Sequence, residues 1–353
     1  MGFTDIDCHI IVRANPAGIR AATNPEMAET GNENRPGNTR CFMASNHAKV
    51  IIGTRGSPLA MTQAHMVQQA LAAAHGWAVD DLPLKSIMTS GDTYTDRALS
   101  EIGGKGLFTK ELDIAQENGT IDIAVHSAKD LPTVLPDYLA IAGYLPREDV
   151  RDVFISHKAK TLTDLPQGAV VGSAALRRQA QIKRLRPDLQ IVLLRGNVGT
   201  RLSKLEKGEV DATLLALAGL KRLGKADVAT AILDTEAFLP AVAQGAIAIT
   251  IRKGDVKTQE VLAPILDTET GIAVTAERAF LTVLDGSCRT PIAGHARVID
   301  GALHFKGRVL RPDGSECLEV ERKGAVADAE AIGRDAGMDI KARMPTGFLD
   351  PAN

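Results

Sequence analysis

The sequence feature that most constrains the fold is a short apolar run, residues 121–125, that ends abruptly in polar residues. Only Asp122 interrupts the run, which is typical of a buried parallel strand between helical segments. The residues after the run include His126, Ser127, Lys129 and Asp130. Ligands of α/β sheets bind beyond the carboxyl ends of the strands. Lys129 and Asp130 are therefore predicted either to face a ligand or to form a salt bridge with each other.

The residues before this run predict an alternation of strands and helices. Strands are predicted at residues 49–54, 84–88 and 121–125, and helices at residues 58–75 and 107–118. Ser57 is suited to cap the first helix, Pro58 suits its first turn, and Gly76 suits its end. This β-α-β-α-β order predicts a parallel sheet with helices on both faces.

The same alternation restarts near residue 169. Strands are predicted at residues 169–172, 190–194 and 212–217. Helices are predicted at residues 176–185 and from the segment after Arg201 to Lys207, where Gly208 closes the helix. Ser173 is a candidate cap for the first of these helices. A late strand at residues 246–251 is predicted to cross back into the first half. The chain therefore contains two similar α/β halves.

The last part of the chain has a different pattern. Residues 269–284 predict an amphipathic helix, and residues 326–342 predict a final helix. Between them, Asp300-Gly301 and the Pro-Asp-Gly sequence at 312–314 are turn signatures that separate alternating strands. This part is predicted to be a smaller α+β domain. The predicted domains are residues 48–146 with about 243–264, residues 147–242, and residues 265–353.

Composition narrows the class of protein. The net charge of −2 gives no global basic field that would attract nucleic acid. Four cysteines in 353 residues do not form a disulfide framework, and no apolar run approaches the roughly 20 residues of a membrane span. We expect a soluble protein of a reducing compartment, and the metal-ligand spacings of zinc sites are absent from the sequence.

Residues 1–47 are expected to be a disordered leader. They are rich in Asn, Pro, Gly and Thr and lack a sustained apolar period. A basic start followed by an apolar core, which marks a signal peptide, is absent. A transit peptide is less consistent with the acidic residues of this segment, and Met43 is a candidate start of translation.

Arginines follow several of the predicted strands, or lie in the first turn of a helix. They are Arg55, Arg177, Arg178, Arg195, Arg201 and Arg222. Helix N-termini already favour anions, and a guanidinium can hold a carboxylate or a phosphate through two bonds. A solvated basic face and a nucleic-acid site are the alternatives, although no aromatic residue interleaves these arginines for base stacking. A polyanionic small molecule is the favoured ligand.

Two further features carry weaker signals. The Gly-Gly-Lys-Gly sequence at 103–106 is not a nucleotide-binding P-loop, because no Ser or Thr follows Lys105. Cys288 lies in a polar Gly-Ser loop beside Arg289, which favours the thiolate of the cysteine. A packing role for Cys288 is the alternative.

Together these residues resemble the porphobilinogen deaminase (hydroxymethylbilane synthase) family. The matching segments are Gly-Thr-Arg-Gly-Ser-Pro-Leu-Ala (53–60), Gly-Gly-Lys-Gly-Leu-Phe (103–108), Asp-Ile-Ala-Val-His-Ser-Ala-Lys-Asp (122–130), Arg-Glu-Asp (147–149), Leu-Arg-Arg-Gln (176–179), Leu-Arg-Gly-Asn-Val-Gly-Thr-Arg-Leu (194–202) and Ala-Gly-Leu-Lys-Arg-Leu-Gly (218–224). The resemblance runs from about Lys49 to the end of the chain and weakens after Pro291.

The resemblance implies a fold of two α/β domains like those of periplasmic binding proteins plus a smaller C-terminal α+β domain. It implies a transferase that condenses four porphobilinogens head-to-tail into hydroxymethylbilane and releases ammonia. Its cofactor would be a dipyrromethane bound covalently to Cys288, and Asp130 would be the catalytic residue. The residues implied to hold cofactor and substrate are Arg55, Ser57, Lys105, Lys129, Ser173, Arg177, Arg178, Arg195, Arg201 and Arg222.

The chain departs from the family pattern at a few positions. Ala174 and Ala175 stand where hydroxyl residues usually precede the arginine pair, and Ala243 stands where a glycine usually precedes Gln-Gly. Asp285-Gly-Ser-Cys replaces the more common Gly-Gly-Cys. The rival hypothesis is a non-catalytic, two-lobed binder of a small polycarboxylate. The enzyme is expected to be a cytoplasmic monomer that binds neither nucleic acid nor membrane.

Overall fold

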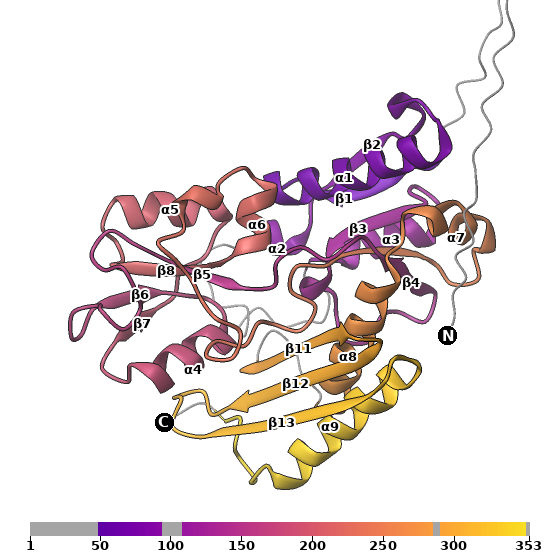
Figure 1. Ribbon diagram of the computed structural model, residues 1–353. Coiled ribbons are helices and arrows are strands. Elements are labelled where there is room, and N and C mark those ends of the chain that lie inside the picture. Colours follow the sequence, from indigo (N-terminus) through magenta and orange to yellow (C-terminus); the bar gives the residue numbers. More distant parts are fainter. Residues whose placement is uncertain (1–48, 94–107, 285–289, 351–353) are drawn as a thin grey trace, which may run out of the picture. The chain divides into compact units, whose positions relative to one another are not determined.

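The computed structural model describes residues 49–93, 108–284 and 290–350 (Figure 1). The predicted leader, Lys105 with its glycine-rich loop, and Cys288 lie outside the described residues. Within those ranges, no helix is long and apolar enough to cross a membrane. The same ranges contain no group of three or more His, Cys, Asp or Glu side chains that could hold a metal ion.

The first sheet has five strands and confirms the parallel unit predicted from the sequence (Figure 1). Its strand order is β2 (Leu84–Ile87), β1 (Ile52–Arg55), β3 (Ile123–Ser127), β10 (Ile247–Arg252) and β4 (Leu139–Tyr144). Strands β2, β1 and β3 are parallel, and β10 pairs antiparallel with both β3 and β4. The late strand therefore returns to the first half of the chain, as predicted.

The second sheet repeats this arrangement. Its order is β7 (Gln190–Val192), β6 (Val170–Gly172), β8 (Ala212–Ala216), β5 (Asp152–Ser156) and β9 (Ala231–Ile232). Strand β5 is antiparallel to its neighbours, as β10 is in the first sheet. The chain thus leaves the first sheet after β4, enters the second through β5 and comes back through β10. These two antiparallel strands account for the mixed character of the sheets.

Helices with recognisable end signals flank the two sheets. The longer ones are α1 (Pro58–His75), α3 (Lys110–Glu117), α4 (Leu176–Leu185) and α5 (Val198–Glu206). The shorter ones are α2 (Ser90–Thr93), α6 (Leu217–Arg222), α7 (Val256–Leu262) and the 3-10 turns η1 (Val79–Asp81), η2 (Ala128–Asp130), η3 (Ala226–Val228) and η4 (Ala263–Ile265). In α1 the side chain of Ser57 accepts a hydrogen bond from the backbone N–H of Ala60, and Gly76 closes the helix at φ 65°. Both end signals of this helix were predicted.

The third sheet is an antiparallel meander packed against two helices (Figure 1). The elements are α8 (Thr268–Val283), β11 (Ile292–Ile299), β12 (Ala302–Leu310), β13 (Cys317–Ala325), η5 (Val326–Asp328) and α9 (Ala329–Arg343). Phe280 of α8 and Phe305 of β12 meet in its core, with ring centroids 5.1 Å apart. Asp300 and Gly301 both have positive φ, as a two-residue hairpin turn of type I′ requires. The predicted fold class is therefore confirmed.

Some local predictions were wrong. Strand β3 begins at Ile123 and continues through His126 and Ser127, because both residues pair with β10. Helix α4 is not capped by Ser173; its N-cap position is Ala175, which has no side chain able to accept a hydrogen bond. Ser173 instead accepts a hydrogen bond from the backbone N–H of Ala175, two residues on.

Glu277 joins the third sheet to both segments that run between the first two sheets. Its side chain is fully buried. It accepts hydrogen bonds from both terminal nitrogens of Arg147, at 2.7 and 3.0 Å, and from the backbone N–H groups of Ala243 and Ala296, at 2.6 and 2.7 Å. Ala243 adopts φ 61°, a left-handed conformation that explains why glycine suits this position.

Gly245 gives the first testable prediction. It has φ 88°, and a Cβ at this position would lie 2.3 Å from the backbone oxygen of Glu148. Gly254 is a matched control, because its φ is 84° but nothing lies within 4 Å of a Cβ there. Gly254→Ala should cost about 1–2 kcal/mol through the left-handed backbone. Gly245→Ala should cost about 1–3 kcal/mol more, because the backbone must also move.

Urea unfolding followed by circular dichroism measures both changes. Equal losses of stability in the two variants would contradict the close approach of Gly245 to Glu148.

Candidate active site

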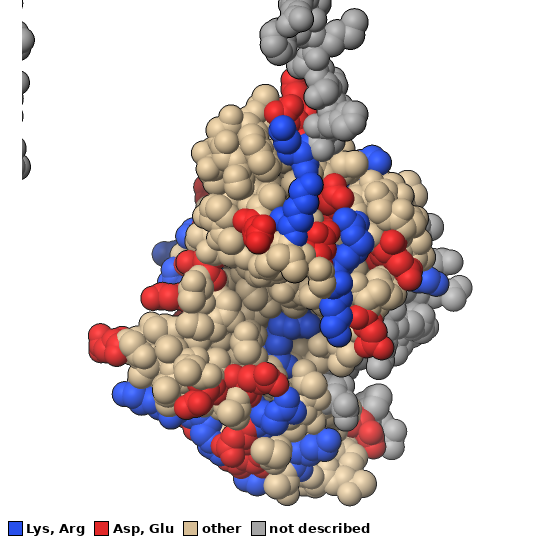
Figure 2. All heavy atoms as spheres, turned by 90° about the vertical axis from the view of Figure 1, so that its right-hand side faces the viewer, with Lys and Arg blue, Asp and Glu red and all other residues tan. Residues whose placement is uncertain are grey.

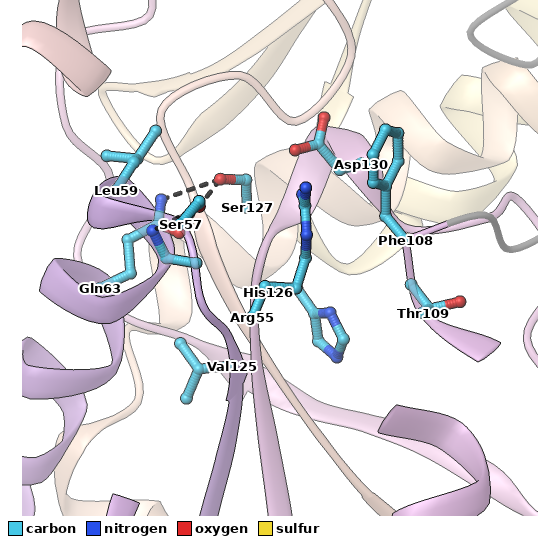
Figure 3. Close-up of a pocket in the computed structure, with 11 residues that line it drawn as sticks. Arg55, Ser57, Leu59, Gln63, Phe108, Thr109, Val125, His126, Ser127 and Asp130 are labelled. Carbon is cyan, nitrogen blue, oxygen red and sulfur yellow. Dashed lines mark hydrogen bonds between the residues drawn. The ribbon is translucent and has the colours of Figure 1, made fainter. Parts of the chain in front are cut away.

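A small pocket lies where β1 and β3 end in the first sheet (Figure 3). Its volume is about 60 Å³. Asp130 reaches it from η2, the turn that follows β3, and Arg55 reaches it from the last position of β1. Ser57 lies at the entry to α1, where it also caps the helix. The structure thus brings three of the predicted site residues together at the carboxyl ends of parallel strands.

Aromatic and neutral polar groups complete the pocket. The guanidinium of Arg55 lies 4.3 Å from the ring centroid of Phe108, within the range of a cation–π contact. Figure 3 shows both side chains beside Asp130. Burial, followed by the nearby charge of Arg55, lowers the pKa of His126 to about 4. His126 is therefore neutral at pH 7, and Asp130 is the acidic group of the pocket.

Lys129 connects η2 to a buried network. Its Nζ donates to Oε1 of Gln244 at 3.2 Å, and Nε2 of Gln244 donates to Asp152 at 2.8 Å. Loss of hydration around the ammonium and the neighbouring guanidinium of Arg178 lower the pKa of Lys129. Lys129 and Asp130 are exposed. The salt bridges of the described residues do not include a pair between these two side chains.

Asp152 lies at the centre of this network and is fully buried. It accepts a hydrogen bond of 2.7 Å from Nη2 of Arg177 and another of 2.7 Å from Nη2 of Arg178. Burial alone would raise the pKa of Asp152, but the two guanidinium groups outweigh it and hold the pKa below its ordinary value. Nη1 of Arg177 donates to the carbonyl of Leu239 and Nη1 of Arg178 to that of Leu214. Both arginines are thus largely bonded inside the protein.

Two of the other predicted arginines donate to backbone carbonyls. Arg201 donates its Nε to the carbonyl of Gly196 at 2.8 Å, and Arg222 donates Nη2 to the carbonyl of Gly245 at 2.5 Å. Burial lowers the pKa of each of these arginines to about 10. Arg195 is buried, and its charge, with those of Arg178 and Asp130, acts on Arg201. Arg201 therefore lies in the same electrostatic neighbourhood as Asp130, whereas Glu148 is the charge that acts on Arg222.

This arrangement fits a polyanionic ligand. Five cations gather near Asp130 and Asp152: Lys129, Arg177, Arg178, Arg195 and Arg201. Two of the predicted arginines also carry a buried N–H for which the described residues provide no acceptor, Nε of Arg178 and Nε of Arg222. Such groups are costly to leave unbonded, and a ligand carboxylate would satisfy them. The excess of positive charge and the missing acceptors both favour an anion.

Several site residues were not predicted from the sequence. Gln63 is buried and exchanges hydrogen bonds with Ser127 at 2.9 and 3.1 Å. Asp152, Gln244 and Phe108 are the other residues missed. Phe108 is the last residue of the family segment 103–108, and Gln244 belongs to the Gln-Gly pattern that follows Ala243. Their positions in these family motifs could have identified both as site residues. Asp152 gave no signal, because an aspartate at a strand start is indistinguishable from a surface residue.

Fold and site define a class of protein, an α/β protein whose cationic site suits a small polyanion. A family profile described as porphobilinogen deaminase, dipyrromethane cofactor binding domain, matches residues 50–260, and one described as the porphobilinogen deaminase C-terminal domain matches residues 272–342. The chain belongs to the porphobilinogen deaminase family.

Named relatives agree with these matches. Porphobilinogen deaminase of Nitrobacter winogradskyi is 58% identical over 298 residues, which cover 84% of this chain and 94% of the relative. That of Nitrobacter hamburgensis is 56% identical over the same length and shares. Among solved structures, a methionine-bound nutrient binding protein from Burkholderia cenocepacia is 16% identical, with a TM-score of 0.40 over 63% of this chain and 93% of its own.

Family membership confirms the predicted function. The enzyme is a transferase, hydroxymethylbilane synthase, that condenses four porphobilinogens into the linear tetrapyrrole and releases ammonia. Porphobilinogen is its substrate, and dipyrromethane is its covalent cofactor. The alternative of a non-catalytic binding protein is not supported by these relatives.

Asp152 gives the second prediction. Asp152→Asn removes the one carboxylate that pairs with two buried guanidinium groups. Breaking a buried ion pair by removing one partner typically costs about 3–5 kcal/mol, so the free energy of unfolding should fall by that amount. The matched control is Asp188→Asn, which breaks the more accessible pair with Arg186 and should change stability little. Urea unfolding of the two variants measures this difference in the free energy of unfolding. A similar unfolding midpoint for both variants would contradict a special contribution of Asp152 to stability.

Proposed function

We propose that Asp130 is the catalytic carboxylate of the condensation. The observation that carries this proposal is its position: an exposed carboxylate, at the end of a central parallel strand, inside a neighbourhood of arginine and lysine side chains. Those cations supply binding sites for the substrate's acetate and propionate groups. Among the described residues, Asp130 is the exposed carboxylate of this neighbourhood, whereas Asp152 is buried and paired with Arg177 and Arg178. Asp130 is therefore the carboxylate able to stabilise positive charge on a substrate.

Positive charge develops when the aminomethyl C–N bond of porphobilinogen breaks and ammonia leaves. The methylene-pyrrole that remains is cationic until the α-carbon of a second pyrrole attacks its methylene carbon. The positive charge then passes to the attacking ring, which becomes neutral when it loses the proton on that α-carbon. At a separation of about 4 Å and an effective dielectric of about 20, a carboxylate stabilises a unit positive charge by roughly 4 kcal/mol. That corresponds to about a thousandfold in rate.

We further propose that the predicted basic and hydroxyl residues hold the cofactor and the growing chain. They are Arg55, Ser57, Lys105, Lys129, Ser173, Arg177, Arg178, Arg195, Arg201 and Arg222. The unsatisfied N–H groups of Arg178 and Arg222 support this assignment. Arg177 and Arg178 would contribute chiefly charge and Nε, because their terminal nitrogens already bond Asp152 and backbone carbonyls. When bound to Cys288, dipyrromethane supplies the pyrrole to which the first substrate is joined.

We also propose that the enzyme is a cytoplasmic monomer without nucleic-acid or membrane partners. The net charge of −2 supports the absence of a nucleic-acid partner, as does the lack of aromatic residues in the sequence from 171 to 222, which contains most of the site arginines. The proposed domains are residues 48–146 with about 243–264, residues 147–242 and residues 265–353. The return of β10 to the first sheet supports the discontinuous first domain.

The third prediction separates catalysis from binding. Asp130→Asn should lower kcat about a thousandfold and leave KM nearly unchanged, because the lost interaction exists mainly in the transition state. Asp137→Asn is the matched control, since Asp137 is exposed and lies outside the pocket. Steady-state kinetics of both folded variants provide the measurement. A near-normal kcat with a raised KM in Asp130→Asn would make Asp130 a binding residue.

The fourth prediction concerns the cofactor cysteine. The wild-type enzyme should show a fixed mass excess in intact mass spectrometry, and Cys288→Ser should lose that excess. Cys317→Ser should retain it, because Cys317 begins β13 and burial raises the pKa of its thiol, which disfavours the reactive thiolate. Peptide mapping that places a pyrrole adduct on Cys317 would overturn the assignment of Cys288.

A further inference from the structure

A second pocket lies against α8, away from Asp130. Its volume is about 480 Å³, within the range of roughly 300–1,000 Å³ that is usual for small-molecule sites. One face of α8 forms a wall, where Thr275, Arg278 and Thr282 recur at helical spacing. Edge strand β4 forms the opposite wall with Ile141 and Tyr144. None of the residues that line the Asp130 pocket lines this one.

Arg278 is the unusual residue of this second pocket. Its Nη2 donates to the backbone carbonyls of Pro132 and Thr133, at 2.8 and 2.9 Å. Among the hydrogen bonds and ion pairs of the described residues, Arg278 has these two bonds and no carboxylate partner, and its Nε and Nη1 are not among the buried atoms that lack a partner. Burial lowers the pKa of Arg278, as expected for a cation without a compensating anion. A partly buried guanidinium in this state is a binding group for an anion.

The same combination of features occurs in the substrate site. Arg201 and Arg222 each donate to a backbone carbonyl and have a pKa lowered by burial. By contrast, the purely structural arginine Arg147 is neutralised by Glu277. In its hydrogen bonds and its burial, Arg278 therefore resembles the proposed substrate-binding residues Arg201 and Arg222 more than it resembles Arg147.

The rest of the second pocket determines what kind of anion fits. Glu330 and Arg334 on its rim pair with each other at 2.6 Å and contribute no net charge. Burial raises the pKa of Tyr144, so its phenol is neutral and available as a hydrogen-bond donor. Ile141 and Ala279 supply apolar surface. The face of the molecule drawn in Figure 2 is hollowed near its centre, with Lys or Arg atoms in the hollow.

We propose that this pocket binds a small monocarboxylate with an apolar body, with its carboxylate on Arg278 and its body against Ile141 and Ala279. One unpaired guanidinium compensates one negative charge, which disfavours a phosphate dianion. The hydroxyl groups of Tyr144 and Thr275 give the carboxylate further polar neighbours, whereas the hydroxyl of Thr282 donates to the backbone carbonyl of Arg278. The site is separate from the porphobilinogen site and does not depend on the role assigned to Asp130.

Calorimetric titration of the cofactor-loaded, full-length enzyme tests this site, with benzoate as the probe. Benzamide is the uncharged control of the same shape, and inorganic phosphate tests the alternative anion. Thr275→Trp fills the pocket from an exposed position of α8, and Arg278→Gln removes the charge. Thr163→Trp is the matched control, because Thr163 is exposed and does not line the pocket.

Benzoate should bind the wild type and Thr163→Trp with equal affinity, and its Kd should rise at least about tenfold in Thr275→Trp and Arg278→Gln. If Arg278→Gln does not fold, Thr275→Trp alone decides. Absent benzoate binding in the wild type would overturn the proposal. Binding that survives in Thr275→Trp would also overturn it, since the signal would then come from the substrate arginines. Benzamide or phosphate binding as tightly as benzoate would overturn the assignment of a monocarboxylate.

Discussion

The buried carboxylate of Glu277 is the constraint on which the rest of the structure depends. A buried negative charge is stable only when it is paired and hydrogen-bonded, and Glu277 obtains a bidentate Arg147 and two backbone N–H groups. Those partners come from both segments that run between the first two sheets and from β11 of the third. One side chain of α8 thus fixes the connections among all three sheets. Without the Glu277 carboxylate, the guanidinium of Arg147 and the N–H groups of Ala243 and Ala296 would all lose this acceptor. Loss of Glu277 would therefore weaken all of these connections at once.

The segment that contains Ala243 connects Glu277 to the candidate active site. Glu277 accepts a hydrogen bond from the N–H of Ala243. The next residue, Gln244, accepts a hydrogen bond from Lys129 and donates one to Asp152. Asp152 in turn holds Arg177 and Arg178. A substitution of Arg177 would therefore disturb folding and ligand binding together. For this reason, kinetics at Asp130, which is exposed and outside this network, are the cleaner measure of catalysis.

Local chemistry made part of this structure predictable from the sequence. The ends of α1 follow from Ser57 and Gly76, and the turn between β11 and β12 follows from Asp300-Gly301, because single residues determine these features. The family motifs contain the arginines whose charges act near Asp130 in the structure, Arg178, Arg195 and Arg201. The partners of those arginines could not be predicted. Asp152 and Gln244 lie 92 residues apart, and only the exchange of strands between the two sheets brings them into contact.

The buried arginines divide into two groups by the charge of their partners. Arg147, Arg177 and Arg178 each meet a buried carboxylate, which stabilises the folded form. Glu277 balances the charge of Arg147, whereas Arg177 and Arg178 share Asp152, which balances one of their two charges. The second group is Arg201, Arg222 and Arg278. In that group, uncharged carbonyls are the hydrogen-bond acceptors provided by the described residues, and burial lowers the pKa of each. A carbonyl orients a guanidinium without neutralising it, which keeps the charge available for an anion. Arg201 and Arg222 are the arginines proposed to hold substrate carboxylates, and Arg278 shares their hydrogen bonding and burial, which is why its own pocket is proposed for an anionic ligand.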